Sequence, residues 1–238
     1  MKAKIIAIFV MTLLITTAIS AIGVTIEKIE KIEPSESKNG GVDQEQTEHC
    51  GYGMIISPPY MTSQSFKPSV EELKGVQLYL FKYSNPPAGV EITVSIRDAL
   101  DGVDLTSKTI NADDENIKAS GTWVFFNFDD ITVIPEETYY INCYANGGGA
   151  TSNCYCWLFD NDSAYTRGEA WWSDDNGVTW ITLFEWSGFD PEWEESDYCF
   201  KTYYQVSRTK EIQTLFLKIL QRFPNAFPIL RQLLGLLN

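Results

Sequence analysis

Two-residue alternation of apolar and polar side chains is the feature that most restricts the fold of this chain. In the segment EITVSIR, Ile92, Val94 and Ile96 point to one face of an extended chain, and the segment 75–82 repeats the pattern. Further apolar or aromatic runs, separated by turn residues such as Pro, Gly and Asn, are 123–128, 131–134, 138–144, 155–159, 169–172, 178–184 and 198–204. Because no helical period interrupts 75–205, we expect an all-β, jelly-roll-like antiparallel β-sandwich.

The first residues have the pattern of a targeting segment. Lys2 and Lys4 precede the uncharged run 5–18, and the small residues Ser20 and Ala21 follow it. This order is typical of a secretory signal peptide, whose helix is removed on export. The alternative is an uncleaved N-terminal anchor, but the apolar run is shorter than the roughly 20 residues that a spanning helix needs. Either reading predicts a secreted, extracellular protein.

Composition divides the rest of the chain. Residues 27–46 are charged and polar, with isolated apolar residues that bury too little surface to offset ordering entropy. We therefore expect a signal peptide at 1–21, a flexible linker at 22–49, a β-sandwich domain at 50–207 and an amphipathic helical tail at 208–238.

Charge follows the same division. The chain has a net charge of −14, yet residues 40–207 carry 27 acidic and 8 basic side chains, a net charge of −19. Residues 208–238 carry five basic side chains and one acidic, a net charge of +4. A nucleic-acid partner is not expected, because phosphate binding requires a basic face. With His49 as the single histidine, a His-rich zinc site is excluded and catalysis by imidazole has one candidate.

The order of motifs resembles a class of secreted archaeal and bacterial surface modules. The resemblance rests on QSFKP (64–68), GVQLYLFK (75–82), VEITVSIRDALDG (90–102), WVFFNFDDITVIPEETYYI (123–141) and YCFKTYY (198–204). It covers roughly 60–205, and the modules it resembles are β-sandwich domains of the choice-of-anchor and carbohydrate-binding-module kind. The resemblance implies a fold and a cell-surface location and brings no catalytic residues. The chain departs from the pattern by placing cysteines within the strands.

Five cysteines in an exported chain predict disulfides, with one thiol left over. We expect at least one bridge that joins the group Cys143, Cys154 and Cys156 to Cys199 or Cys50, with the pairing open. A thiolate metal site is disfavoured because the Cys-x-Cys spacing differs from the usual Cys-x-x-Cys. A Cys50–His49 catalytic dyad is disfavoured because sequence neighbours at a linker edge have poor geometry.

Aromatic residues gather in the last third of the domain. Carbohydrate-binding surfaces use exposed rings, which stack on sugar C–H faces while polar groups bond the hydroxyls. The candidate ligand-binding residues are Trp157, Trp171, Trp172, Trp186, Trp193 and Tyr165. The alternatives are that most rings belong to the core or mark a protein contact. Because Trp171 and Trp172 are adjacent on a predicted strand, one must face the core and the other must face away.

One local motif is specific. The run SDDNGVTW (173–180) resembles the Asp-box, a hairpin turn found in sialidases and other extracellular β-proteins. Gly177 supplies a positive φ, Asp175 accepts turn amides and Trp180 packs under the turn. A single copy indicates a hairpin and does not predict a propeller.

Carboxylates offer two further readings. Asp98, Asp101 and Asp104 provide hard oxygen ligands in a loop, so a structural Ca²⁺ is a candidate cofactor, although the Asp-Gly turn explains Asp101 without metal. Paired carboxylates also suffice for glycoside hydrolysis, but chance proximity is easy in so acidic a chain.

The C-terminal tail changes period. Apolar residues recur at helical spacing at Ile212, Leu215, Phe216, Ile219, Leu220 and Phe223, and Pro224 ends the run. A second short helix can follow Pro228. Such a tail also resembles the ends of archaeal exported proteins. It contacts a membrane surface or an anchor partner, pairs with its own copy, or folds back on the sandwich.

These features predict an exported, cell-surface binding or adhesion module without catalytic activity, with a glycan or envelope protein as its partner. The alternatives are a carbohydrate-active enzyme that uses paired carboxylates and a purely structural envelope protein.

Overall fold

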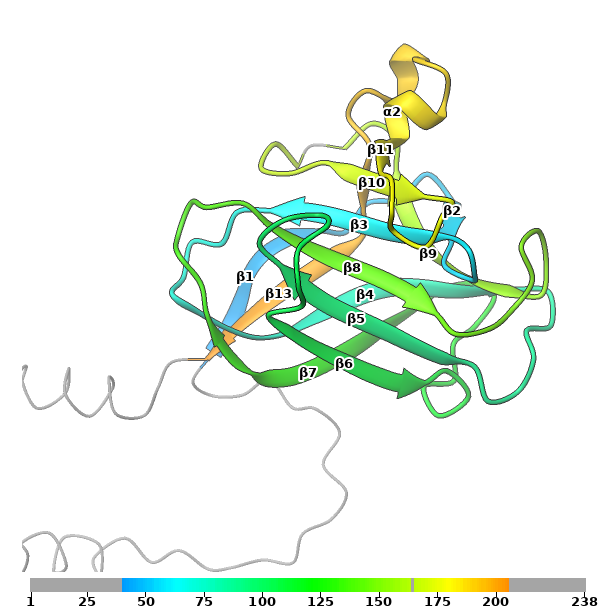
Figure 1. The fold of residues 1–238 in the computed structure, drawn as a ribbon, viewed down its shortest axis with the longest axis horizontal. Coiled ribbons are helices and arrows are strands. Elements are labelled where there is room, and N and C mark those ends of the chain that lie inside the picture. The colour runs from blue at the N-terminus through cyan, green and yellow to red at the C-terminus, as the bar shows by residue number, and fades with distance from the viewer. Residues whose placement is uncertain (1–39, 164, 206–238) are drawn as a thin grey trace, which may run out of the picture. The chain divides into compact units, whose positions relative to one another are not determined.

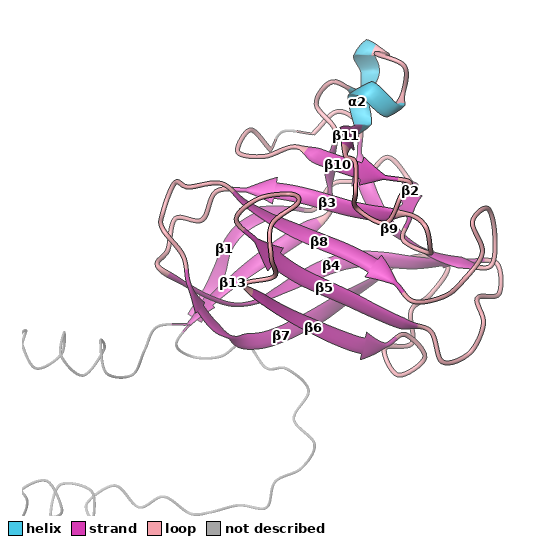
Figure 2. Cartoon of the chain, in the orientation of Figure 1, coloured by secondary structure: helices cyan, strands magenta, loops and turns pink. Residues whose placement is uncertain are grey.

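The computed structural model describes residues 40–163 and 165–205 (Figure 1). The predicted signal peptide, most of the predicted linker and the predicted helical tail lie outside these residues. Within them, strands form two antiparallel sheets that pack face to face, which confirms the all-β sandwich (Figure 2). No helix in the described part is long and apolar enough to span a membrane.

The first sheet carries the strand order β1-β13-β4-β9-β12, with β2 beside β9 and β7 beside β4. Its strands are β1 (Gly40–Gln46), β2 (Tyr52–Ile55), β4 (Glu72–Tyr83), β7 (Thr122–Thr132), β9 (Cys154–Asp160), β12 (Asp197–Tyr198) and β13 (Phe200–Gln205). The second sheet has the order β11-β10-β3-β8-β5-β6. Its strands are β3 (Met61–Phe66), β5 (Glu91–Arg97), β6 (Thr106–Asn111), β8 (Tyr139–Ala145), β10 (Ala170–Ser173) and β11 (Ile181–Thr182). Two short helices, α2 (Leu183–Trp186) and η1 (Pro191–Trp193), lie between β11 and β12.

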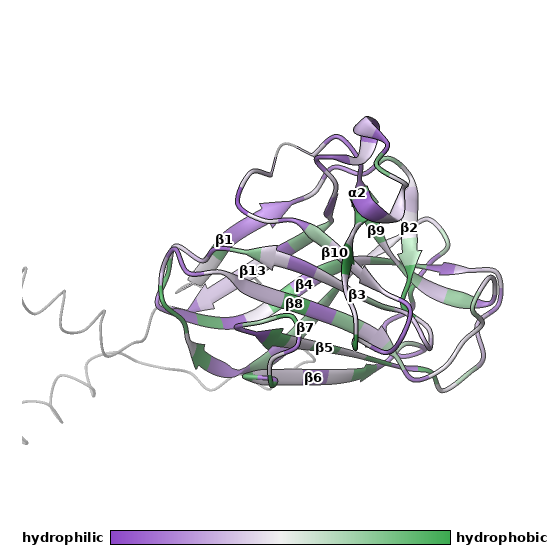
Figure 3. Ribbon diagram, turned by 45° about the horizontal axis from the view of Figure 1, so that its top comes forward, coloured by the Kyte–Doolittle hydropathy of each residue, from purple (hydrophilic) through white to green (hydrophobic). Residues whose placement is uncertain are grey.

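The core forms where the apolar faces of the two sheets meet. Ile92, Val94 and Ile96 of β5 are fully buried, as the alternation predicts. Fully buried Val76 and Leu78 of β4 belong to the same cluster from the opposite sheet. Figure 3 shows hydrophobic and hydrophilic colouring changing along the strands, as a two-layer fold requires.

The boundary of the domain differs from the prediction. Residues 40–46, which composition assigned to the linker, form β1 and pair with β13 from Gly40↔Gln205 to Gln46↔Phe200. Backbone pairing explains this, because it tolerates polar side chains that find partners: the Gln44 amide donates to Thr202 Oγ1 at 3.0 Å. The sandwich therefore includes residues that precede Cys50 by as many as ten positions.

Three strand predictions also need correction. The run 123–128 and the first two residues of the run 131–134 belong to one strand, β7, whose pairing with β4 shifts register between Leu73 and Gly75, and residues 133–134 lie beyond its end. The run 178–184 contains only the two-residue β11, because α2 begins at Leu183. The run 198–204 is divided between β12 and β13 at Cys199. Sequence patterning missed β3, whose six residues MTSQSF are all buried although four are polar.

Candidate functional site

The candidate site is one end of the second sheet, where β10, β11, α2 and η1 come together; we call it the aromatic tip. In Figure 1 these elements lie at the top of the molecule. Pairing fixes the base of the tip, since β10 is hydrogen-bonded to β3 from Ala170↔Gln64 to Ser173↔Met61. The tip is therefore a projection held by the sandwich.

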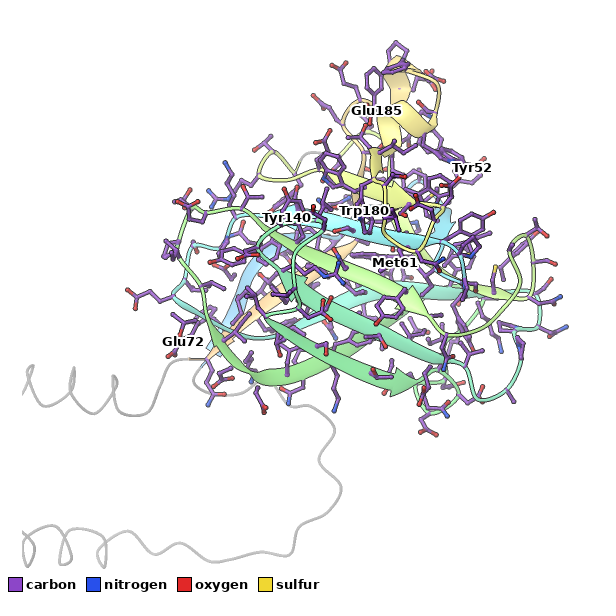
Figure 4. The ribbon with its side chains drawn as sticks, in the orientation of Figure 1. Tyr52, Met61, Glu72, Tyr140, Trp180 and Glu185 are labelled. Atoms are coloured by element: carbon purple, nitrogen blue, oxygen red, sulfur yellow. The ribbon has the colours of Figure 1, made fainter. Side chains whose placement is uncertain are left out.

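The turn after β10 has the hydrogen bonds predicted for an Asp-box. Ser173 Oγ accepts from the Gly177 amide at 2.9 Å, and Asp175 Oδ1 accepts from the Thr179 amide at 2.8 Å. The bonds from Thr179 lower the pKa of the Asp175 carboxyl. Gly177 has the expected positive φ of 82°. A Cβ on Gly177 would lie 3.4 Å from the Trp180 ring, which places that ring under the turn. Figure 4 labels Trp180 and Met61 side by side below β10.

Helix α2 is short because the sequence caps it at both ends. At its start, Thr182 Oγ1 accepts from the Glu185 amide at 3.1 Å, and Glu185 Oε2 accepts from the Thr182 amide at 2.9 Å. This is a capping box. At its end, Gly188 has φ 80° and its amide donates to Glu185 O, while the Phe189 amide donates to Phe184 O at 3.0 Å. This is a Schellman motif, and the Phe184–Phe189 ring contact at 5.3 Å is its usual hydrophobic partner.

A chain of aromatic rings runs through the tip. Trp172 stacks on Tyr60 with centroids 5.4 Å apart, and meets Trp186 edge-on at 6.2 Å. Trp186 is 5.5 Å from Trp193, which in turn lies 5.1 Å from the buried Phe159. This ring chain therefore begins at the surface and ends in the core. Within it, Trp186 stays 43% exposed, so its ring is held by neighbours and still offers a face to a ligand.

An acidic hollow of about 510 Å³ adjoins the rings. Its lining residues are Asn161, Asp162, Pro191, Glu192, Glu194 and Glu195. Helix η1 connects the two features, because it contributes Pro191 and Glu192 to the hollow and Trp193 to the ring chain. Carboxylates beside exposed rings form the combination of acceptors and apolar faces that sugars bind.

The structure separates the predicted ligand-binding residues. Trp172, Trp186 and Trp193 come together in the ring chain. Trp171 occupies the opposite side of β10 from Trp172, as adjacency required, and Trp172 is the one packed against the core. The buried Nε1 of Trp171 has no hydrogen-bond partner among the described residues.

One of the predicted ligand-binding residues, Trp157, is corrected, and Tyr165 lies apart from the ring chain. Trp157 is fully buried: its ring stacks on Tyr198 at 4.5 Å, and its Nε1 donates to Cys199 O at 2.8 Å. Tyr165 packs edge-on against Phe200 at 5.2 Å with its hydroxyl buried. Trp157 therefore presents no face to solvent, because β9 turns it inward, whereas Tyr165 is half-buried. Tyr60, which sequence reasoning missed, belongs to the ring chain through its contact with Trp172; its only signal was a Tyr beside the turn that precedes β3.

The predicted calcium ligands do not converge. Asp104 forms an ion pair with Arg97 at 2.6 Å, and a Cβ on Gly102 would lie 3.1 Å from Asp98 Oδ1 at the Asp-Gly turn. Among the described residues, no group of three or more His, Cys, Asp or Glu side chains could hold a metal ion. The loop is therefore explained by local hydrogen bonds and one ion pair.

The predicted disulfide is absent, and all five cysteines are free thiols. Cys143 belongs to the core on β8 of the second sheet, whereas Cys154 and Cys156 lie on β9 of the first, outside that core. The Sγ atoms of Cys154 and Cys156 are 3.9 Å apart. The Cys199 thiol donates to Glu48 O at 2.9 Å. Burial raises the pKa of Cys143, Cys156 and Cys199.

A buried carboxyl that sequence reasoning missed lies at the base of the tip. Asp197 is 2% exposed and accepts from Gln64 Nε2 at 2.5 Å. Burial is the largest cause that raises its pKa to about 8; Gln64 and Ser163 lower the pKa, and the nearby Glu169 and Asp160 also raise it. Its burial removes it from contact with a substrate, so its role is in the fold.

The sequence matches no protein-family model and no curated protein. The resemblance to choice-of-anchor modules therefore stays a prediction.

Proposed function

We propose that this protein is an exported, cell-surface binding module that holds glycans at the aromatic tip and carries out no catalysis. One observation supports the proposal: Trp186 is 43% exposed while its ring contacts the rings of both Trp172 and Trp193. A ring that is both exposed and held loses little entropy when a sugar stacks on it. The jelly-roll, choice-of-anchor assignment and the signal peptide belong to the same proposal.

Charge selects among glycans. The carboxylates of the hollow and the net charge of −19 over 40–207 repel anionic polysaccharides and accept hydrogen bonds from hydroxyl and ammonium groups. The ligand class is therefore neutral or amino-sugar glycans. An exposed ring beside carboxylates is also a surface that proteins use, so an envelope protein is the competing partner.

The test is a glycan array probed with the chain from residue 22, followed by calorimetry on the sugar that binds. We expect Trp186→Ala to weaken binding at least tenfold, equivalent to about 1.4 kcal/mol. Tyr52→Ala is the matched control, because Tyr52 is an exposed ring (69%) on β2 outside the ring chain. Thermal melting of both variants separates lost binding from lost folding.

Three outcomes contradict the proposal. Binding that survives Trp186→Ala would place the ligand elsewhere. Turnover of the bound sugar that one Asp or Glu substitution abolishes would make the protein a carbohydrate-active enzyme. Binding to no glycan in the array, neutral or anionic, would favour a structural envelope protein.

A further inference from the structure

An apolar groove with an acidic rim lies at the end of the first sheet, where β4 begins and β7 ends. It has a volume of about 370 Å³ and is lined by Glu71, Glu72, Thr132, Val133, Ile134 and Pro135. Pairing holds its two sides together, with Glu72↔Thr132 in register and the Val133 amide donating to Glu71 O at 2.9 Å. Ile134 is 62% exposed beside the buried Val133. An isoleucine so exposed, in a groove that two glutamates also line, offers a place for an apolar side chain with a basic neighbour.

The described chain ends beside this groove. Strand β13 runs antiparallel to β4, with Phe200 opposite Leu78 and Tyr203 opposite Gly75. The same register, continued past Tyr203, brings the last residues of β13 to the level where Glu72 begins β4. Figure 4 shows Glu72 at the lower left, where the ribbon of β13 also ends. The segment that follows Gln205 therefore starts next to the groove.

The composition of that segment complements the groove. Residues 208–238 have a net charge of +4, against −19 for 40–207. Arg208 and Lys210 come first, and the apolar Ile212 follows two residues later. The seven residues from Gln205 to Ile212 span about 10 Å as a helix and up to about 25 Å extended, so Ile212 reaches the groove in either conformation.

We propose that the groove is the docking site of the chain's own C-terminal segment, with Ile212 against Ile134 and Lys210 or Arg208 against the carboxylate rim. A covalently attached segment has an effective concentration in the millimolar range, which favours it over a second copy. The rim gives the contact an electrostatic part that salt weakens. This inference goes beyond the glycan-binding proposal and does not depend on it.

The experiment is zero-length carbodiimide cross-linking of the chain from residue 22, read by mass spectrometry. We expect a cross-link between Lys210 and Glu71 or Glu72 within one chain, with a yield that falls as salt increases. Glu72→Lys and Ile134→Ser should each lower the yield at least fivefold. The double variant Glu72→Lys with Lys210→Glu should recover it, because the charges are exchanged. Glu137→Lys is the control, since Glu137 is exposed nearby and does not line the groove.

Other occupants give different results. A mixture of isotope-labelled and unlabelled chains that cross-links only between copies would overturn the proposal in favour of a dimer. Absence of the cross-link, together with flotation on vesicles of anionic lipid that deletion after Ser207 abolishes, would overturn it in favour of a membrane-surface tail. Because Glu72 and Ile134 are surface residues, the melting temperature verifies that each variant is folded.

Discussion

At the scale of single residues, Asp197 holds an ionisable group where water does not reach. Gln64 donates to it and also accepts from the Tyr198 amide at 2.7 Å, so one glutamine links β3 to β12. The raised pKa means that the folded protein binds a proton that the unfolded chain releases. The contribution of Asp197 to stability is therefore complete below pH 4 and is lost as the pH rises towards about 8.

Asp197→Asn should remove this dependence. The amide keeps the shape and the hydrogen bonds of the protonated carboxyl, and it has no charge to desolvate. We expect the variant to be more stable than the parent at pH 8 and close to it at pH 4, measured by urea unfolding at both values. Asp162→Asn, at an exposed carboxyl of the acidic hollow, is the control. If the free energy of unfolding changed by the same amount between pH 4 and pH 8 in the parent and in Asp197→Asn, Asp197 would be ionised in the folded protein.

At the scale of elements, α2 shows how local chemistry stops a strand. The alternation of 178–184 favours an extended chain, but Thr182 and Glu185 form a capping box, and Gly188, three residues after Glu185, follows the end of the helix. As a result the side chain of Trp186 projects from a helix.

Gly188→Ala should therefore destabilise the protein through its backbone. The residue has φ 80°, and a Cβ there would meet no atom within 4 Å, so the cost is conformational. We expect a loss of about 1 kcal/mol and a melting temperature lower by about 2–4 °C. Gly188→Asn should lose less, because asparagine tolerates the left-handed conformation. Equal losses in the two variants would indicate a steric cause.

At the scale of the whole molecule, β1 protects the edge of the first sheet. Glu45 forms an ion pair with Lys201 at 3.1 Å, and Val42 lies opposite Tyr203. Without β1, the backbone groups of β13 would be unpaired and free to join another chain. The strand is thus part of the domain although its composition is that of a linker.

A chain of residues 50–205 should accordingly be less stable than one of residues 40–205. We expect a melting temperature lower by more than about 5 °C, equivalent to roughly 1–2 kcal/mol, and concentration-dependent association. Calorimetry and light scattering at two concentrations measure both effects. Identical behaviour of the two chains would mean that β1 contributes nothing to the sandwich.

The sequence by itself determined the features that depend on neighbours along the chain. Alternation placed the strand that contains Ile92, and turn chemistry placed the hairpin at Gly177, because both are set within a few residues. The same local rules would have found the ends of α2. They also required Trp171 and Trp172 to face opposite sides of β10, since successive side chains on a strand alternate.

The tertiary structure alone decided which rings are exposed and which polar residues are buried. Trp157 and Trp186 are the same residue type in similar surroundings along the chain, yet Trp157 is covered by Tyr198, 41 residues later, and Trp186 is not. The polar strand β3 is buried because β10 and β8 flank it and supply partners from distant segments, as Asn142 does for Ser63. Burial depends on contacts between strands far apart in sequence, and a local pattern carries no information about which strands will meet.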